Sequence, residues 1–201
     1  MRERGLVPDF PPEALAELEA VAREPREADD SIRDLRRLAW ASIDNDESRD
    51  LDQLSVAKEE QGAVTILVAI ADVDTRVRQG GAIDARARTN TTSVYTAAET
   101  FHMLPPQVST DLTSLNAGED RLAVVVEFTV DADGGVSRTG ICRALVHNQA
   151  KLTYDGVAAW LGGGPVPPAL AAVPGPLRTS GCSAAPRSRC AGAAIGSARS
   201  R

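Results

Sequence analysis

The sequence predicts an α+β fold, in which a mixed β-sheet is flanked by helices. Residues 63–71 (AVTILVAIA) form a short, almost wholly apolar run that is rich in β-branched residues. Residues 121–130 and 135–147 flank the turn sequence DADGG, which is a typical hairpin arrangement. Helical spacing of apolar residues occurs both before and after these strands. Such a mixture favours helices packed on a sheet.

The N-terminal segment, residues 1–30, is predicted to be helical. Apolar residues recur at helical spacing over residues 12–24 (PEALAELEAVARE). Pro12 suits the first turn of a helix and Pro25 ends the pattern. We expect a short amphipathic helix that packs against other elements and carries no chemistry of its own.

The next segment, residues 31–160, is predicted to contain the sheet. Residues 38–43 (LAWASI) are expected to form a strand that runs into an acidic loop. The strand at 63–71 is expected to be buried on both faces, because nearly all of its side chains are apolar. Helical patterns return at 82–90 and 153–161.

The last segment, residues 161–201, differs sharply in composition. It contains no acidic or aromatic residue but holds half of the twelve prolines and two of the three cysteines. This Ala/Gly/Pro/Ser/Arg mixture cannot bury enough apolar surface to fold alone. Two interpretations stay open: a native flexible tail, or translation of a GC-rich gene in a shifted reading frame. We expect no site residues there.

The charge of the chain limits how it could bind nucleic acid. The net charge is −6, and all 28 acidic residues lie at or before Asp155. Because five arginines follow that residue, residues 1–155 carry 17 − 28 = −11. Nucleic-acid affinity usually comes from basic residues that neutralise phosphates. An approach to RNA therefore requires metal ions on clustered carboxylates, or a basic groove supplied from elsewhere.

The sequence also predicts a cytoplasmic protein with no membrane segment. The three cysteines are widely spaced, which favours reduced thiols over a disulfide framework. No apolar run approaches the roughly 20 residues of a membrane-spanning helix, and no signal sequence follows the first arginines.

The segment richest in potential chemistry is the acidic loop, defined here as residues 44–53 (DNDESRDLDQ), with five carboxylates in its first nine positions. Like charges this close repel unless they are solvated, protonated or shared by a cation. Asp44, Asp50 and Asp52 are spaced by six and two residues. If the backbone at 50–52 is extended, Asp50 and Asp52 fall on one face and Leu51 on the other.

Three interpretations of the acidic loop compete. The first is a solvated turn. The second, a calcium-binding EF-hand loop, fails because Arg49 stands where glycine is needed and Ser55 where a bidentate glutamate belongs. The third is a catalytic Mg²⁺ or Mn²⁺ site for phosphodiester hydrolysis, which short oxygen-only ligands suit.

The order of these residues resembles the metal-binding signature of the RNase II/RNase R family, whose catalytic domain is the RNB domain. Asp44, Asp50 and Asp52 match the first three acids of that signature. Further blocks follow in register, which are DLR at 34–36, AIADV at 69–73, DARAR at 84–88, TSVY at 92–95, MLP at 103–105, LTSL at 112–115 with Arg121, and LTY at 152–154. The resemblance covers about residues 33–160, the N-terminal part of the family domain.

The resemblance implies a 3′→5′ exoribonuclease that degrades single-stranded RNA to nucleoside 5′-monophosphates. It implies that Asp44, Asp50 and Asp52 hold Mg²⁺, with Mn²⁺ as a possible substitute, and that Asp52 is the most critical of them. Tyr95 matches an aromatic residue that stacks on a base near the RNA 3′ end, a contact worth roughly 1–3 kcal/mol. The alternative for Tyr95 is an ordinary buried tyrosine of a strand.

Two departures from the family pattern favour an alternative function. Gln53 replaces the fourth acid, and an amide brings no charge to a cation. The later family elements that act on the phosphate have no counterpart before residue 160. The alternative is a non-catalytic RNA-binding fragment or an inactive remnant.

Three other residues are expected to have structural roles. Asp72 ends the apolar strand, and we expect it to cap or hydrogen-bond the following turn rather than to act in catalysis. Arg86 and Arg88 lie two residues apart on the expected helix and so face different directions. A solvated helix face is expected for both.

Overall fold

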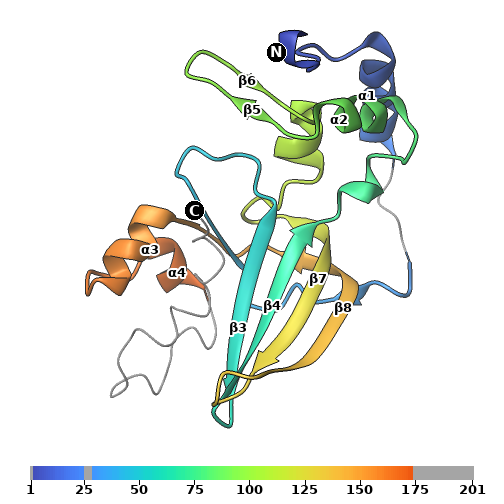
Figure 1. Cartoon of the computed structure of the whole chain (residues 1–201). Coiled ribbons are helices and arrows are strands. Elements are labelled where there is room, and N and C mark those ends of the chain that lie inside the picture. The colour runs from blue at the N-terminus through green and yellow to red at the C-terminus, as the bar shows by residue number, and fades with distance from the viewer. Residues whose placement is uncertain (1, 25–28, 174–201) are drawn as a thin grey trace.

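The structure, a computed structural model, describes residues 2–24 and 29–173 and is centred on a mixed β-sheet. Its strands are β1 (Arg33–Asp34), β2 (Ala41–Asp44), β3 (Gln53–Glu60), β4 (Ala63–Ala71), β7 (Asp120–Val130), β8 (Val136–His147) and β9 (Ala150–Thr153). Their order in the sheet is β1-β8-β7-β4-β3-β2-β9 (Figure 1). β1 pairs in parallel with β8 and β2 with β9, whereas the other pairs are antiparallel. The α+β class with a mixed sheet is confirmed.

Two hairpins form the middle of the sheet, and the local sequence explains both. The β7–β8 hairpin is the one that DADGG predicts, with the Asp131 amide donating to the Gly135 carbonyl (2.8 Å). The β3–β4 hairpin turns at Gln61 and Gly62, whose φ angles of 53° and 84° are both positive. Two positive φ angles in a two-residue loop define a type I′ turn, whose twist suits paired strands. The sequence analysis did not predict β3.

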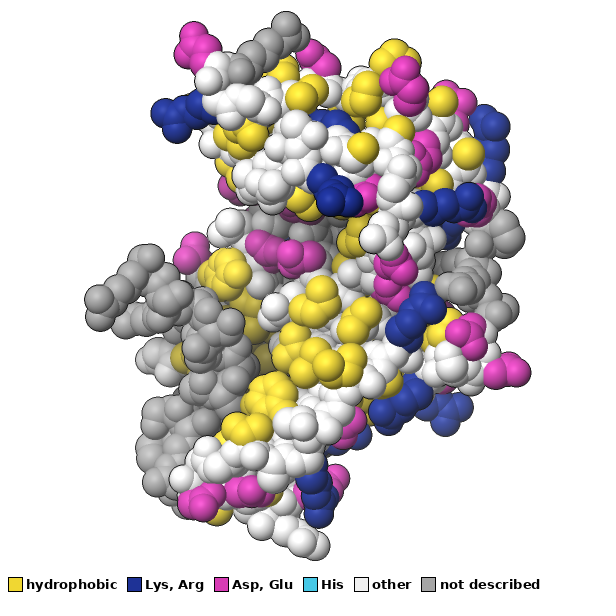
Figure 2. Space-filling model, turned by 45° about the vertical axis from the view of Figure 1, so that its right-hand side comes forward, with side chains coloured by type: hydrophobic (Ala, Val, Ile, Leu, Met, Phe, Trp, Pro, Cys, Tyr) yellow, Lys and Arg dark blue, Asp and Glu magenta, His cyan; other side chains and the backbone are white. Residues whose placement is uncertain are grey.

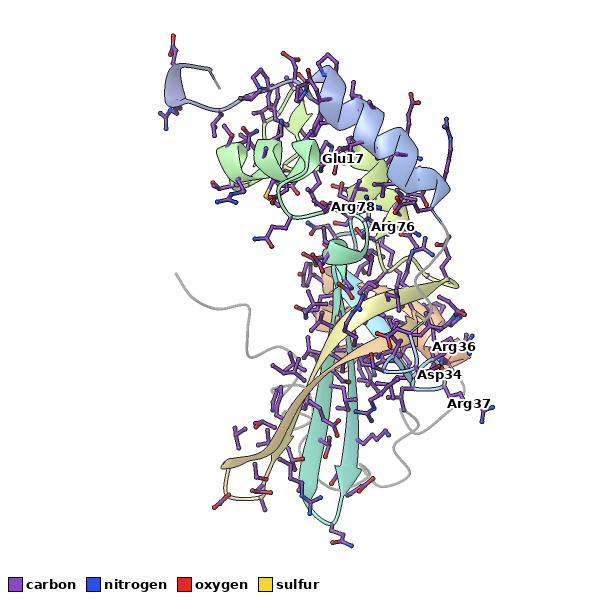
Figure 3. All side chains as sticks on the ribbon, turned by 90° about the vertical axis from the view of Figure 1, so that its right-hand side faces the viewer. Glu17, Asp34, Arg36, Arg37, Arg76 and Arg78 are labelled. Carbon is purple, nitrogen blue, oxygen red and sulfur yellow. The ribbon has the colours of Figure 1, made fainter. Side chains whose placement is uncertain are left out.

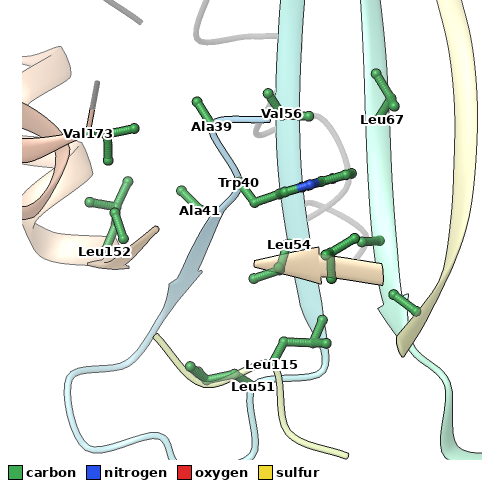
Figure 4. Close-up of a cluster of buried hydrophobic side chains, with 14 of the residues drawn as sticks. Ala39, Trp40, Ala41, Leu51, Leu54, Val56, Leu67, Leu115, Leu152 and Val173 are labelled. Carbon is green, nitrogen blue, oxygen red and sulfur yellow. The ribbon is translucent and has the colours of Figure 1, made fainter. Parts of the chain in front are cut away.

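The main hydrophobic core lies on one face of this sheet. Alternate side chains of β3, β4, β7 and β8 point into it, among them Leu54, Leu67 and Val125. Trp40, which is fully buried, lies against β3 and donates its indole N–H to the Leu35 carbonyl (2.9 Å) (Figure 4). This core fixes the end of β2 and the start of β3, which bracket the acidic loop.

The opposite face of the sheet is partly open to solvent. Hydrophobic side chains gather over the strands in Figure 2, and Ile70 and Ile141 are 40% and 75% exposed. The prediction that 63–71 is buried on both faces is therefore wrong. Its apolar run reflects one buried face and one that no described segment covers completely.

Two helices pack beside β9 and β2 at one side of the sheet (Figure 1). They are α3 (Tyr154–Leu161) and α4 (Pro168–Ala172). Leu170 and Val173 are buried in the main core, so the folded part extends beyond the boundary expected at residue 160. The remainder of segment 161–201, with Cys182 and Cys190, lies outside the described residues.

The other helices form a second body at one end of the sheet (Figure 1). It comprises η1 (Arg2–Arg4), α1 (Pro12–Arg23), η2 (Val73–Thr75), α2 (Ala82–Asn90), β5 (Val94–Tyr95), β6 (Thr100–Phe101) and the π-helix η3 (Val108–Leu112). A small core of Ala14, Ile83, Leu104 and Val108 joins α1, α2 and η3. The helices expected at 12–24 and 82–90 are confirmed.

Charged side chains attach α1 to this body (Figure 3). Glu17 accepts from the first two amides of α2 (2.6 and 3.1 Å), where a carboxylate is favoured by the positive end of the helix dipole. Arg76 donates to two carbonyl groups near the end of α1 (2.9 and 3.1 Å), and Arg78 pairs with Glu24 (2.6 Å). The N-terminal helix thus packs on the elements that follow β4.

Arg86 departs from the solvated position expected of it. It is 4% exposed, lies over the ring of Phe10 (4.3 Å to the centroid), and donates to carbonyl groups of residues 7, 8, 102 and 103. Arg88 is exposed, as expected. No helix in the described part of the chain is long and apolar enough to cross a bilayer.

Candidate functional site

The acidic loop connects β2 to β3 and is anchored by one buried leucine. Leu51 is 3% exposed and lies beside Leu115 at the edge of the main core (Figure 4). Because neighbouring side chains of an extended segment point in opposite directions, burial of Leu51 turns Asp50 and Asp52 toward the surface. The alternation expected at 50–52 is therefore present.

Backbone and hydroxyl hydrogen bonds fix the second half of the loop. The Leu51 amide donates to Ser114 Oγ (3.0 Å), and the Leu115 amide donates to the Leu51 carbonyl (2.7 Å). The Ala71 amide, at the end of β4, donates to the Asp52 carbonyl (2.9 Å). The backbone that carries Asp50 and Asp52 is thus tied to two separate parts of the fold.

A lysine fixes the first half of the loop. Lys151 lies on β9, next to β2, and its Nζ donates to the carbonyl oxygens of Asp46 (2.6 Å) and Ser48 (2.7 Å). Its positive charge also opposes the concentration of negative charge on the loop. Neither Lys151 nor a supporting role for Ser114 was predicted from the sequence, although Ser114 belongs to the LTSL block at 112–115.

Two of the three candidate carboxylates, Asp44 and Asp50, lie within electrostatic range of the third, Asp52. Asp44 Oδ1 accepts from Ser48 Oγ (2.7 Å), and Asp50 Oδ2 accepts from the hydroxyl of Tyr95 (3.1 Å). Asp52 is accessible to solvent, but the protein around its carboxyl group removes part of its hydration and raises its pKa. The negative charges of Asp44 and Asp50 raise this pKa further.

Tyr95 extends over this group from the β5–β6 hairpin, which projects from the helical body toward the loop (Figure 1). The residue is 67% exposed, so the alternative of a buried strand tyrosine is wrong. Partial burial of its hydroxyl and the charge of Asp50 raise its pKa, so the phenol stays protonated and donates to that carboxylate. Its ring remains available to a flat ligand.

The donor set has the chemistry of a Mg²⁺ or Mn²⁺ site, but its side chains do not converge on one point. Within residues 2–24 and 29–173, no three His, Cys, Asp or Glu side chains gather closely enough to bind one ion. Asp44 and Asp50 instead use oxygens to accept from Ser48 and Tyr95. A cation that binds through these same two oxygens would displace both hydrogen bonds. The metal site therefore stays a prediction.

Two nearby residues complete the account of the site. Gln53 is the exposed first residue of β3 and its backbone pairs with Ile70. Asp72 is 5% exposed and forms an ion pair with Arg143 (2.8 Å). Asp72 caps the following turn as expected, but through its backbone: it is the N-cap of η2, and its carbonyl accepts from Thr75 Oγ1 (2.6 Å), while its carboxylate pairs with Arg143.

Comparison with known proteins identifies relatives of this chain. Residues 32–179 match the model of the RNB domain. The chain is 36% identical over 164 residues to Ribonuclease R of Acidithiobacillus ferrooxidans, covering 81% of this chain and 37% of that protein. It is 38% identical over 149 residues to the Inactive exonuclease DIS3L2 of Arabidopsis thaliana, covering 73% and 14%. The chain thus spans well under half the length of these curated relatives.

A solved structure agrees with the sequence comparison. Mycoplasma genitalium RNase R in complex with ribose methylated single-stranded RNA is 27% identical and superposes with a TM-score of 0.72. The likeness covers 79% of this chain and 25% of that protein. The central sheet and its flanking helices are therefore those of a ribonuclease domain.

Proposed function

Because the chain belongs to the RNB domain family of ribonucleases, we propose that it acts in metal-assisted 3′→5′ hydrolysis of single-stranded RNA to nucleoside 5′-monophosphates. One observation carries the proposal: Asp52 lies within electrostatic range of both Asp44 and Asp50, and Asp50 is bonded to the exposed Tyr95. Since the chain spans a fraction of its relatives' length, the activity of this chain is itself part of the proposal.

In this proposal, Asp44, Asp50 and Asp52 hold Mg²⁺ or Mn²⁺. The negative charges of Asp44 and Asp50 raise the pKa of Asp52, and a divalent cation among the three carboxylates would remove this repulsion. When bound, the ion supplies positive charge to the phosphate oxygens and lowers the pKa of a water molecule. Gln53 adds no charge to this set, so we expect weaker metal binding than with a fourth acid.

The Tyr95 ring stacks on a base near the RNA 3′ end and brings the last phosphodiester to the aspartates. Its 3.1 Å bond to Asp50 places the ring and the carboxylates side by side. In the hydrolysis, a water oxygen bonds to the phosphorus, and the bond to the 3′ oxygen of the preceding nucleotide breaks. That oxygen takes up a proton, and the released nucleotide keeps the phosphate on its 5′ carbon.

The alternative function is RNA binding without turnover. Gln53 in place of the fourth acid favours it, as does similarity to a relative that is named an inactive exonuclease. In that case, Tyr95 still binds a base, while the aspartates hold too little charge in the right place for hydrolysis.

The two functions separate in one experiment. The full chain is incubated with 5′-labelled single-stranded RNA and Mg²⁺, and the products are resolved by length. Hydrolysis predicts stepwise shortening from the 3′ end and release of mononucleotides, both of which EDTA abolishes. Asp52→Asn should reduce the rate by more than the roughly 10- to 100-fold that loss of an outer-shell partner costs. Salt-sensitive binding without shortening supports the alternative. If the chain neither binds nor shortens the RNA, both proposed functions are overturned.

A further inference from the structure

Ser114 lies directly beneath the acidic loop and contacts it through its hydroxyl group. The residue is 1% exposed, and its Oγ accepts from the Leu51 amide (3.0 Å). The same oxygen lies within donating distance of the Arg49 carbonyl (2.9 Å) and of Asn116 Oδ1 (2.9 Å). Since a hydroxyl carries one hydrogen, it donates to one of these acceptors at a time.

The two loop groups that Ser114 contacts belong to the peptide units on either side of Asp50. The Arg49 carbonyl belongs to the unit before it, and the Leu51 amide to the unit after it. Fixing both units fixes the direction of the Asp50 side chain between them. The peptide unit between Leu51 and Asp52 is fixed as well, because the Leu115 amide donates to the Leu51 carbonyl.

Ser114 is itself held by the end of the π-helix η3. The amide and hydroxyl of Thr113 both donate to the Val108 carbonyl (3.0 and 2.9 Å), which closes the helix one residue before Ser114. Asn116 Nδ2 donates back to the Thr110 carbonyl (3.3 Å). Single π-helical turns often occur at functional sites. Here the turn presents a buried hydroxyl to a segment more than sixty residues away in sequence.

We propose that Ser114 is a positioning residue, whose hydroxyl holds the backbone that carries Asp50 and Asp52 in the place from which their carboxylates bind a divalent cation. The proposal rests on the proposed function above. Ser114 is buried under the loop, so its effect passes through the peptide groups that it fixes. Its removal would leave the Leu51 amide without a partner in a buried position, which favours local opening of the loop.

The test compares Ser114→Ala with Thr129→Ala in the full chain. Thr129 is a matched control, because it is also buried (6% exposed) and its hydroxyl also makes a 2.9 Å bond, to Thr65, at the far end of the sheet. Two quantities are measured: Mn²⁺ affinity by electron paramagnetic resonance, and hydrogen exchange of the Leu51 amide by NMR. Asp52→Asn reports whether bound Mn²⁺ occupies the aspartates.

Loss of one buried hydrogen-bond partner predicts about tenfold weaker Mn²⁺ binding and about tenfold faster exchange in Ser114→Ala. Thr129→Ala should change neither. Ser114→Cys keeps the shape of the side chain with a weaker hydrogen bond, so it should fall between wild type and Ser114→Ala. It also carries the same test if the alanine variant does not fold.

Unchanged exchange of the Leu51 amide overturns the proposal, whatever the metal does. Faster exchange with unchanged Mn²⁺ affinity overturns it too, because the hydroxyl would then hold the loop without orienting its carboxylates. If wild type and Asp52→Asn bind Mn²⁺ equally, or neither binds it, the proposed function falls. The exchange measurement still decides whether Ser114 holds the loop.

Discussion

Replacing Tyr95 with phenylalanine separates two roles that the structure gives to one side chain. The change removes the hydroxyl that donates to Asp50 (3.1 Å) and keeps the ring, which is 67% exposed. Because the bond lies at the surface, we assign it about 0.5–1 kcal/mol. In our proposal the cation binds the Asp50 oxygen that accepts this bond, Oδ2, and so displaces the bond. Tyr95→Phe should therefore bind Mn²⁺ about two- to fivefold more tightly than wild type.

Tyr95→Phe should bind single-stranded RNA with the same affinity as wild type. Tyr95→Ala should lose the roughly 1–3 kcal/mol of binding free energy that a stacked base contributes. Mn²⁺ affinity is measured by electron paramagnetic resonance and RNA affinity by fluorescence anisotropy at fixed salt. Tyr154→Phe, at an exposed tyrosine on α3, is the matched control and should change neither. Weaker Mn²⁺ binding in Tyr95→Phe would refute the reasoning, because the hydroxyl would then assist the metal instead of competing with it.

Three further predictions follow from the contacts of the site. Burial and like charge raise the pKa of Asp52, so ionisation of this carboxyl group costs stability as pH rises through that pKa. Without metal, Asp52→Asn should therefore raise Tm at about pH 7 and leave it unchanged at about pH 3. Calorimetry at both pH values checks this. Arg143→Met should lower the free energy of unfolding by about 3 kcal/mol in urea titrations, because it leaves the buried carboxylate of Asp72 without its ion pair. A change near zero would show that this ion pair does not stabilise the fold. Lys151→Met should speed amide exchange in the first half of the acidic loop about tenfold, and Lys151→Arg should speed it less, because arginine keeps the charge and can still donate to the loop carbonyls.

Much of the fold could be predicted from the sequence, because its elements depend on local patterns. The β7–β8 hairpin follows from DADGG between two apolar strands, and the helix at 82–90 has the expected bounds. The sequence pattern was also sufficient to predict β3, since Leu54 and Val56 alternate with polar residues and a Gln-Gly turn follows. The charges of the neighbouring loop obscured that alternation.

The supports of the candidate site could not be predicted, because they come from distant parts of the chain. The spacing of the aspartates indicates their grouping, but nothing near them in sequence points to Ser114 or Lys151. Arg86 shows the same limit: a solvated helix face was expected, yet carbonyl groups of an N-terminal segment and the ring of Phe10 surround it. Composition also failed to predict that Leu170 packs in the core, because burial of one leucine depends on the surface it meets.

The most direct test of the aspartate site is a crystal structure of the full chain soaked in Mn²⁺, with data collected for anomalous scattering. We predict one anomalous peak within ligand distance of carboxylate oxygens of Asp44, Asp50 and Asp52. We also predict that Asp44 Oδ1 and Asp50 Oδ2 will have given up their bonds to Ser48 and Tyr95. A peak elsewhere, or these two bonds intact under saturating Mn²⁺, would contradict the account.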